Sequence, residues 1–448
     1  MIILFIIFLI IKNNMNYGVG INIMSLDKNL NLNKHNNFYY LIIILYFTLF
    51  VSIGCEKNRI LNNLLSQIHL VIRGKGNQSV LNNTFYPEPY KTYVNSLPKY
   101  SCNKFCVMEY ELNHVTLIFN NVIESCESMF YGSENITEID FSNFDCSQVK
   151  NMSLMLKGCT NLEKINFGNI NTSSVVDMKG LFYNCSNLPS LNLSNFDTSL
   201  VTTMESMFYN CTKLPTIDLS NFNTARVKSF RIIFYKCSEL TEINLSNFDT
   251  SSTTSLYGMF YVCLNLASID VSNFNTKNVE TMDYLFRNCS KLTSLDISNF
   301  NTTKVKTMHN IFAFCTIIQK INLGKLDTSS VEDMRALFYY NENLESADLS
   351  SFDTSKVTLM GWMFFHCYKI KSIILSEKFK TSNVVSMFSM FSHCKSLTSL
   401  DLSSFDTSKV TEMCYMFNND FNLIYLDIPN FSPSNINTIY QMFLIWLL

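Results

Sequence analysis

Apolar and polar positions recur along most of this chain with a step of 26 residues. The segment Leu214–Val227 reads LPTIDLSNFNTARV, and Leu240–Thr253 and Leu292–Val305 repeat it closely. One aromatic position marks each unit, at Phe144, Phe196, Phe222, Phe248, Phe274, Phe300, Phe352, Phe379, Phe405 and Phe431, with Ile170 and Leu326 filling the two gaps. Only the step from Phe352 to Phe379 is 27 residues. A constant period in this range predicts a solenoid, whose units stack and share one continuous core.

Each unit combines two hydrophobic periods. In one unit, apolar residues spaced mostly by three or four predict one face of a helix: Val201, Met204, Met207, Phe208, Cys211 and Leu214. Ile217 and Leu219 then alternate with polar residues, which is typical of a short strand. The Asp-Thr-Ser group that follows the marker Phe, as in Asp197-Thr198-Ser199, predicts a turn and a helix N-cap. We therefore expect an α/β solenoid, a leucine-rich-repeat-like array of about twelve 26-residue strand-turn-helix coils with a small β-rich N-terminal cap.

Three regions follow from the distribution of these patterns. Residues 1–55 contain two apolar runs, Ile2–Ile11 and Phe38–Gly54, and are expected to be a signal peptide or membrane anchor region. Whether residues 38–54 are cleaved or span the membrane, and which Met is the start, stays open. Residues 56–120 are the expected β-rich cap, with strands at Ile68–Arg73 and Val115–Asn120. Residues 121–448 form the repeat array, which ends in apolar residues.

The repeat fits the pattern LxxLDLSxFDTSxVTxMxxMFxxC, seen almost intact in Leu188–Cys211 and Leu397–Phe417. It resembles the BspA-like leucine-rich repeat family, also called the mycoplasma lipoprotein-associated repeat, over about residues 115–443. The resemblance implies a secreted or cell-surface protein that acts in adhesion or recognition. One departure is that Phe stands where leucine-rich repeats usually carry Asn or Cys after the strand, so an aromatic spine is expected to replace the asparagine ladder. The alternative is an intracellular leucine-rich repeat scaffold for protein–protein interaction.

Composition narrows the function classes. Hydrophobic residues make up 47% of the chain and charged residues 16%, which excludes a disordered protein. A formal net charge of −2 argues against binding nucleic acid through bulk electrostatics. With six His and 12 Gly, the sequence has little material for a histidine site or a phosphate loop, and no catalytic motif is present. We therefore expect a non-enzymatic protein without a cofactor or metal.

Cysteine also follows the period. Nine cysteines share one position of the repeat: Cys159, Cys185, Cys211, Cys237, Cys263, Cys289, Cys315, Cys367 and Cys394. Because helices on neighbouring coils would lie about 8–10 Å apart, too far for disulfides, we expect free buried thiols. Cys102, Cys106, Cys126 and Cys146 form a second group near the cap, where one or two disulfides or unpaired thiols are both compatible with the sequence.

Two polar columns run along the outward positions of the predicted strands. Their members are the candidate binding face: Asp218, Ser220, Asn244, Ser246, Asp270, Ser272, Asp296, Ser298, Asp348, Ser350, Asp401 and Ser403. The expected partner is a protein or a glycan, and a membrane could be contacted through the N-terminal apolar segment. The alternative is a solvated strand face held by hydrogen bonds between coils.

Two further columns carry side chains that could bind a metal or a partner. His366-Cys367 and His393-Cys394 stand at equivalent places in adjacent coils, which would suit a two-coil metal site. Because Asn fills the His position in other coils, substitution at the surface is the simpler interpretation. Five tyrosines that follow a Phe are expected to pack between coils: Tyr183, Tyr209, Tyr235, Tyr261 and Tyr339.

Overall fold

The computed structural model describes residues 65–432 and 439–443. All of the described residues belong to one compact unit. The predicted signal peptide or membrane anchor lies outside the described residues. Among those that are described, no helix is long and apolar enough to cross a membrane.

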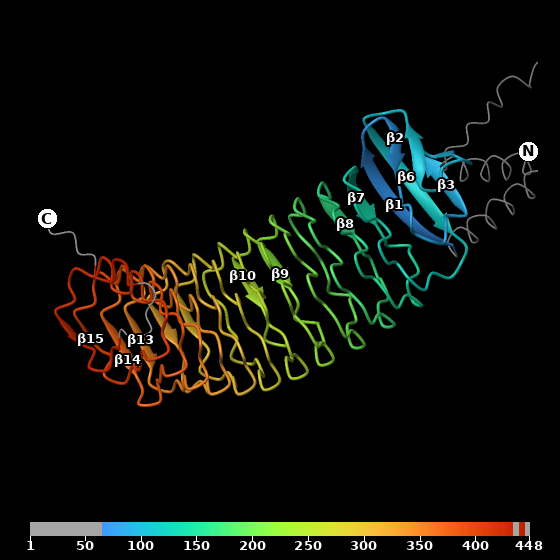
Figure 1. Ribbon diagram of the computed structural model, residues 1–448. Helices are drawn as coiled ribbons and strands as arrows, with labels where there is room; N and C mark the ends of the chain where they lie inside the picture. The colour runs from blue at the N-terminus through green and yellow to red at the C-terminus, as the bar shows by residue number, and fades with distance from the viewer. Residues whose placement is uncertain (1–64, 433–438, 444–448) are drawn as a thin grey trace, which may run out of the picture. The chain divides into compact units, whose positions relative to one another are not determined.

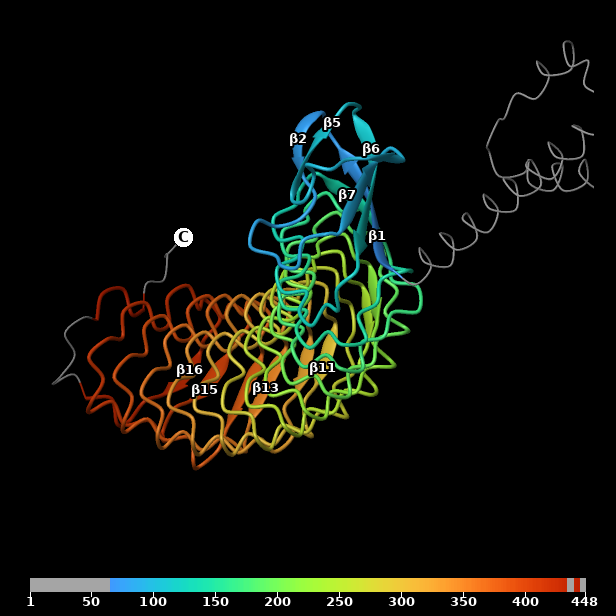
Figure 2. The ribbon, with the colours of Figure 1, turned by 90° about the vertical axis from the view of Figure 1, so that its right-hand side faces the viewer.

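The N-terminal part of this unit is built from antiparallel strands (Figures 1 and 2). They are β1 (Ser66–Arg73), β2 (Gly76–Ser79), β3 (Lys91–Val94), β4 (Leu97–Pro98), β5 (Phe105–Met108) and β6 (Leu112–Phe119). β1 pairs with β6 on one side and with β7 (Ile136–Asp140) on the other, so that Leu70 faces Val115 and Ile139. The sheet order β4-β3-β6-β1-β7-β8 therefore joins the cap directly to the first coils.

Beyond the cap, most coils carry one short strand, which pairs in parallel with its equivalent in a neighbouring coil, and the coils of Asn192 and Asp270 carry none. The strands are β8 (Lys164–Asn166), β9 (Thr216–Asp218), β10 (Glu242–Asn244), β11 (Ser294–Asp296), β12 (Lys320–Asn322), β13 (Ser346–Leu349), β14 (Ser372–Leu375), β15 (Ser399–Asp401) and β16 (Tyr425–Asp427). Ile217 faces Ile243 across β9 and β10, a shift of one repeat. Isolated parallel bridges such as Ser255↔Thr281 form a second line of pairing on each coil. The core lies between these two lines.

The predicted helix of each coil is wrong. No helix occurs in residues 65–432 and 439–443, and the fold is a β-solenoid of about eleven coils. In the coil of Met204, alternate backbone N–H groups bond within the coil, for example Met207 N to Met204 O at 3.2 Å. The N–H groups between them bond to the next coil: Ser206 N to Arg231 O at 3.0 Å and Phe208 N to Ile233 O at 2.9 Å. The segment is thus a run of tight turns that also pairs along the stack.

The spacing between coils explains why a helix does not form. Phe208 and Phe234 occupy equivalent positions on neighbouring coils, and their stacked ring centroids are 5.6 Å apart. Packed helices need about 8–10 Å between axes, whereas paired strands need about 4.8 Å. Coils this close on both sides leave no room for helices. The spacing of three or four between apolar residues arises instead because the turns repeat at that interval.

Two residues in every coil have left-handed backbone conformations, four positions apart. In one coil they are Ser206 and Asn210, each with φ of 57°. Gly180 and Gly258 hold the first position in other coils, and Asn288 holds the second. Gly and Asn adopt positive φ with the least strain, so their recurrence at these two columns is the sequence signal for turns. His366 and His393, both with positive φ, occupy the second column.

A β-branched residue in this second column is expected to lower stability. Val262 has φ of 65°, where its branched side chain is strained. Replacing Val262 by Asn, as in the next coil at Asn288, is expected to raise the free energy of unfolding by about 1 kcal/mol. Urea unfolding checks this, and the reciprocal Asn288→Val should lower stability by a similar amount. Equal midpoints for all three proteins would contradict the assignment of strain.

Candidate functional site

The twelve residues of the candidate binding face lie where the sequence places them. All twelve side chains are exposed on the strand side of the solenoid. Strand pairing aligns the first column from coil to coil, with Asn244 opposite Asp218 and Asp401 opposite Asp427. The sheet therefore presents parallel rows of carboxylate, amide and hydroxyl groups. Their role in binding stays a prediction.

The Asp or Asn of each pair also shapes the turn after the strand. Oδ1 of Asp218 accepts a hydrogen bond from Ser220 N at 3.0 Å, and Oδ1 of Asp401 accepts one from Ser403 N at 2.8 Å. The N–H and hydroxyl of Ser220 lower the pKa of Asp218, and the hydroxyl and N–H of Ser403 do the same for Asp401. These carboxylates stay ionised at neutral pH. Since Asn244 makes the same bond with Ser246, the turn needs the oxygen and not the charge.

Asparagine within this column also links neighbouring coils. Asn322 Nδ2 donates to Asp296 Oδ2 at 2.9 Å, and Asn166 Nδ2 donates to Asp140 Oδ1 at 3.1 Å. An amide donor beside a carboxylate replaces the repulsion that two carboxylates would have at the same spacing. The expected hydrogen bonding between coils and the proposed exposure of the face are therefore compatible.

The sequence analysis did not predict two ladders of side-chain hydrogen bonds between coils, one of Asn and one of buried Thr. In most coils an Asn stands before the marker Phe and donates to carbonyl oxygens of the preceding coil. Asn273 Nδ2, for example, donates to Leu245 O, Ser246 O and Phe248 O at 2.8, 3.1 and 3.0 Å. The expectation that an aromatic spine replaces an asparagine ladder is thus wrong, because both are present. The Thr after each Phe forms the second ladder. Recurrence of both residues at period 26 was the available signal.

The threonine ladder corrects the interpretation of the Asp-Thr-Ser group. Asp197 Oδ1 accepts a hydrogen bond from Ser199 N at 2.9 Å, which confirms the predicted turn. There is no helix in the described residues for the group to cap. Thr198 instead donates to Asn223 O at 3.0 Å and accepts from Asn223 N at 2.8 Å, so one hydroxyl pairs with both backbone groups of a residue in the next coil.

The nine cysteines of the repeat column are free and buried, as predicted. The argument from helices about 8–10 Å apart is wrong, because residues 65–432 and 439–443 contain no helix. Each thiol donates to a carbonyl of the preceding coil, such as Cys211 Sγ to Phe182 O at 3.1 Å. Burial raises the pKa of Cys211 well above its ordinary value, so these thiols are protonated and poor metal ligands.

Asn341 and Asp420 occupy the cysteine column in two of the later coils, where the thiol is missing. Asn341 Oδ1 accepts a hydrogen bond from Cys315 N at 3.0 Å, and Asp420 Oδ1 accepts one from Cys394 N at 2.6 Å. Asp420 is only 4% exposed, and its Oδ2 is buried without a hydrogen-bond partner. Burial raises the pKa of Asp420 to about 8. The buried carboxyl group therefore lowers the stability of the fold, and solvent does not reach it.

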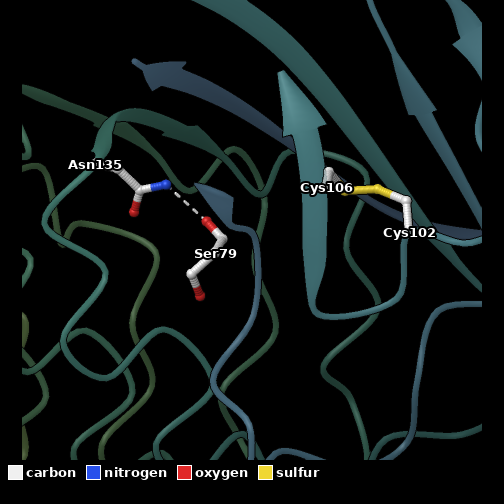
Figure 3. The surroundings of a disulfide bond; sticks show 4 residues. All are labelled: Ser79, Cys102, Cys106 and Asn135. Carbon is white, nitrogen blue, oxygen red and sulfur yellow. Dashed lines mark hydrogen bonds between the residues drawn. A yellow bond between two sulfur atoms is a disulfide. The ribbon is translucent and has the colours of Figure 1, made fainter. Parts of the chain in front are cut away.

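Of the four cysteines near the cap, one pair is bonded. Cys102 and Cys106 form a disulfide across 4.8 Å between Cα atoms at the start of β5 (Figure 3). Cys126 and Cys146 are free and buried. Nearby, Asn135 Nδ2 donates to Ser79 O at 2.7 Å and ties the segment before β7 to β2 (Figure 3). The structure thus selects one disulfide from the alternatives.

The paired histidines form a ring stack and not a metal centre. The ring centroids of His366 and His393 are 4.1 Å apart, and the Tyr368 hydroxyl lies 2.5 Å from His366 Nδ1. Burial, His393 and Lys395 lower the pKa of His366 to about 4. Among the described residues, no group of three or more His, Cys, Asp or Glu is arranged to hold a metal. The tyrosine column stacks between coils as predicted, with Tyr183 and Tyr209 rings 4.1 Å apart.

Comparison with protein families identifies the repeat. A family model described as "Mycoplasma protein of unknown function, DUF285" matches residues 124–243, 230–338, 307–400 and 365–445. The chain belongs to the DUF285 family. These overlapping matches cover the solenoid from its first coils onward, so the DUF285 repeat corresponds to the β-solenoid coil described above.

Other comparisons add little to the DUF285 assignment. Comparison with curated proteins finds no match. Among solved structures, a leucine-rich repeat protein from Eubacterium ventriosum is 16% identical, with 67% of this chain and 86% of that chain covered and a TM-score of 0.30. The functional domain of InlJ from Listeria monocytogenes, described as including a cysteine ladder, is 14% identical, with 64% and 61% covered and a TM-score of 0.20. Similarities at these scores support no functional inference.

Proposed function

We propose that this DUF285 protein is a non-enzymatic, secreted or cell-surface binding protein that recognises a macromolecular partner through the sheet face of its solenoid. The observation that carries the proposal is the exposed, coil-aligned rows of Asp, Asn and Ser on that face. A row of equivalent groups contacts an extended partner at several coils at once, so weak contacts add up. Resemblance of the repeat to the BspA-like family supports a role in adhesion.

The cap supports export. A disulfide such as Cys102–Cys106 persists in oxidising compartments and is rare in a reducing cytosol. Localisation of a tagged full-length protein, with protease access on intact cells, tests this part of the proposal. Protection of the tag on intact cells and its loss on lysis would contradict surface exposure and favour an intracellular scaffold.

The face itself is tested by reversing its charge. The triple variant Asp218→Lys, Asp270→Lys and Asp296→Lys is expected to weaken binding to an immobilised matrix protein at least tenfold, because it replaces three exposed carboxylates by ammonium groups. Plates coated with collagen, fibronectin or laminin provide the measurement. The triple Asp→Asn variant keeps the turn oxygens, as Asn244 does naturally, and separates loss of charge from loss of the turn.

A control reverses two charges elsewhere on the surface. Glu239→Lys with Glu280→Lys changes exposed residues outside the two strand columns and should leave binding unchanged. If the strand-face lysines do not reduce binding, or the control reduces it equally, the sheet face is not the recognition surface.

A further inference from the structure

The solenoid surface is hollowed next to the candidate binding face. A groove of about 660 Å³ runs across the ends of β12, β13 and β14, and contains Asp348 and Ser350 of that face. One wall comes from the coil of Gly324 and the other from the coil of Ser351, and Lys378 of the following coil lies at one end. This volume is within the range of about 300–1,000 Å³ that small-molecule sites occupy.

Two departures from the repeat lie at the groove. Gly324 has φ of +57°, and a Cβ on it would lie 2.6 Å from the Cα of Ser298, so this coil lies tightly against the coil before it. Ser351 in the next coil stands where most coils have the ladder Asn. No hydrogen bond from Ser351 to the coil of Gly324 is found in the described part of the chain. The amide that joins neighbouring coils elsewhere is therefore absent at this place.

A second groove provides an internal comparison. Gly168 has φ of +53°, and a Cβ on it would lie 2.7 Å from the Cα of Ser142, so its coil repeats the close approach of Gly324. There the next coil keeps the ladder residue, and Asn195 Nδ2 donates to Gly168 O at 2.6 Å. The groove at this place is only about 210 Å³. The larger groove has Ser351 in place of this Asn, and its lining carries charged residues that the smaller groove lacks.

The lining of the larger groove alternates hydrogen-bond acceptors with donors. Hydrogen bonds from Ser329 and from Ser350 lower the pKa values of Asp327 and Asp348, so both carboxyl groups are ionised acceptors. Lys325 and Lys378 are exposed, and their ammonium groups make no ion pair or hydrogen bond among residues 65–432. Lys378 also lowers the pKa of Asp327 through its charge, although no salt bridge joins the two among the described residues. Carboxylates and ammonium groups therefore share one open groove and are both accessible to a ligand.

This pattern favours a neutral, hydroxyl-rich ligand. A sugar hydroxyl donates one hydrogen bond and accepts others, so neighbouring hydroxyls can bind a carboxylate and an ammonium group together. A strongly anionic ligand would meet the carboxylates of Asp327, Asp348 and Asp353, and a strongly cationic one would meet the two lysines. We propose that the groove at Gly324 and Ser351 binds a short segment of a neutral glycan. This inference rests on the proposed binding function and assigns a partner class to one part of the face.

Restoring the ladder residue tests the site. Ser351→Asn places an amide in the groove, where it can donate to Gly324 O as Asn195 donates to Gly168 O, so it should obstruct the site without disturbing the fold. The matched control is Ser404→Asn, the same change in the same column outside the groove, where Ser404 Oγ donates to Phe379 O at 3.2 Å. The probes are maltotriose, triacetylchitotriose and mannotriose, with trigalacturonate and spermidine as charged comparisons, and saturation-transfer NMR and calorimetry measure binding.

The full-length protein is expected to bind at least one neutral trisaccharide more tightly than either charged probe. Ser351→Asn should weaken that binding at least tenfold with an unchanged thermal midpoint, and Ser404→Asn should leave it unchanged. No binding of any neutral trisaccharide, preference for a charged probe, or equal binding by Ser351→Asn would each overturn the inference. Binding to matrix proteins by the same variants is a separate readout, so loss of the glycan proposal is distinguishable from loss of the proposed function.

Discussion

Replacing Asp420 by Asn is expected to stabilise the protein by about 3 kcal/mol at pH 8.5 and to destabilise it by about 1 kcal/mol near pH 4. The folded-state pKa of about 8 lies above the value of 3.8 for a free side chain. Between these values the folded protein binds more protons than the unfolded chain, so its stability falls as pH rises. Asn does not titrate and removes that loss.

The expected size follows from the shift in pKa. Four pKa units correspond to roughly 5 kcal/mol, and local opening that admits water reduces the full value. Asn also introduces a donor, and Nδ2 of Asn341 in the same column is itself buried without a partner. This second cost, about 1 kcal/mol or more, is present at every pH.

Urea unfolding of both proteins at pH 4, 6 and 8.5 provides the measurement. Asp420→Cys, which installs the residue of the column, should show the same loss of pH dependence. The reciprocal change Asn341→Asp is a sharper control, because it should introduce a new decline in stability above pH 4 in another coil. If the free energies of unfolding of the original protein and of Asp420→Asn vary with pH in the same way, the pKa of Asp420 is not raised by burial.

The repeat period could be read from the sequence because its cause is simple. A residue that faces the core in one coil does so in every coil, so Phe208, Phe234 and Phe260 recur at 26 residues and stack in the structure. The same argument correctly predicted that the cysteines are buried and that Asp218 and Ser220 are exposed. Periodicity specifies which way a side chain points, whatever the backbone conformation between the columns.

Backbone conformation could not be derived from the same periodicity. Apolar spacing of three or four fits an α-helix and also fits consecutive turns, so Met204, Met207 and Phe208 do not discriminate between them. The discriminating residues are Asn184 and Asn210, which recur at a position of positive φ that a helix does not contain. Strands about 4.8 Å apart and helices about 8–10 Å apart also cannot alternate in tightly stacked coils without fanning apart.

The groove could not be predicted from the sequence for a different reason. It depends on departures from the repeat, Gly324 in one coil and Ser351 in the next, and not on the consensus. Each departure alone looks like ordinary variation. The close approach of Gly324 to Ser298 and the missing Asn lie together at the groove. In a repeat protein, the residues that break a column are therefore the ones to inspect for individual sites.

Removing one hydroxyl from the threonine ladder is expected to lower the free energy of unfolding by about 3 kcal/mol. Thr250 is fully buried, donates to Asn275 O at 3.0 Å and accepts from Asn275 N at 2.7 Å. Thr250→Val keeps the shape and leaves both backbone groups without a partner in the core. Each unpaired buried group costs about 1–3 kcal/mol. Urea unfolding measures the loss, and hydrogen exchange at Asn275 reports whether the damage is local.

Two controls separate the hydroxyl from the side-chain shape. Thr250→Ser keeps both hydrogen bonds and should cost about 1 kcal/mol for the lost methyl group. Thr254→Val, in the same coil, removes an exposed hydroxyl that donates to Lys228 O at 3.3 Å, and water can replace that bond. Its effect should be within about 0.5 kcal/mol. If Thr254→Val is as damaging as Thr250→Val, the ladder does not hold the coils together, and stability comes from the stacked apolar columns alone.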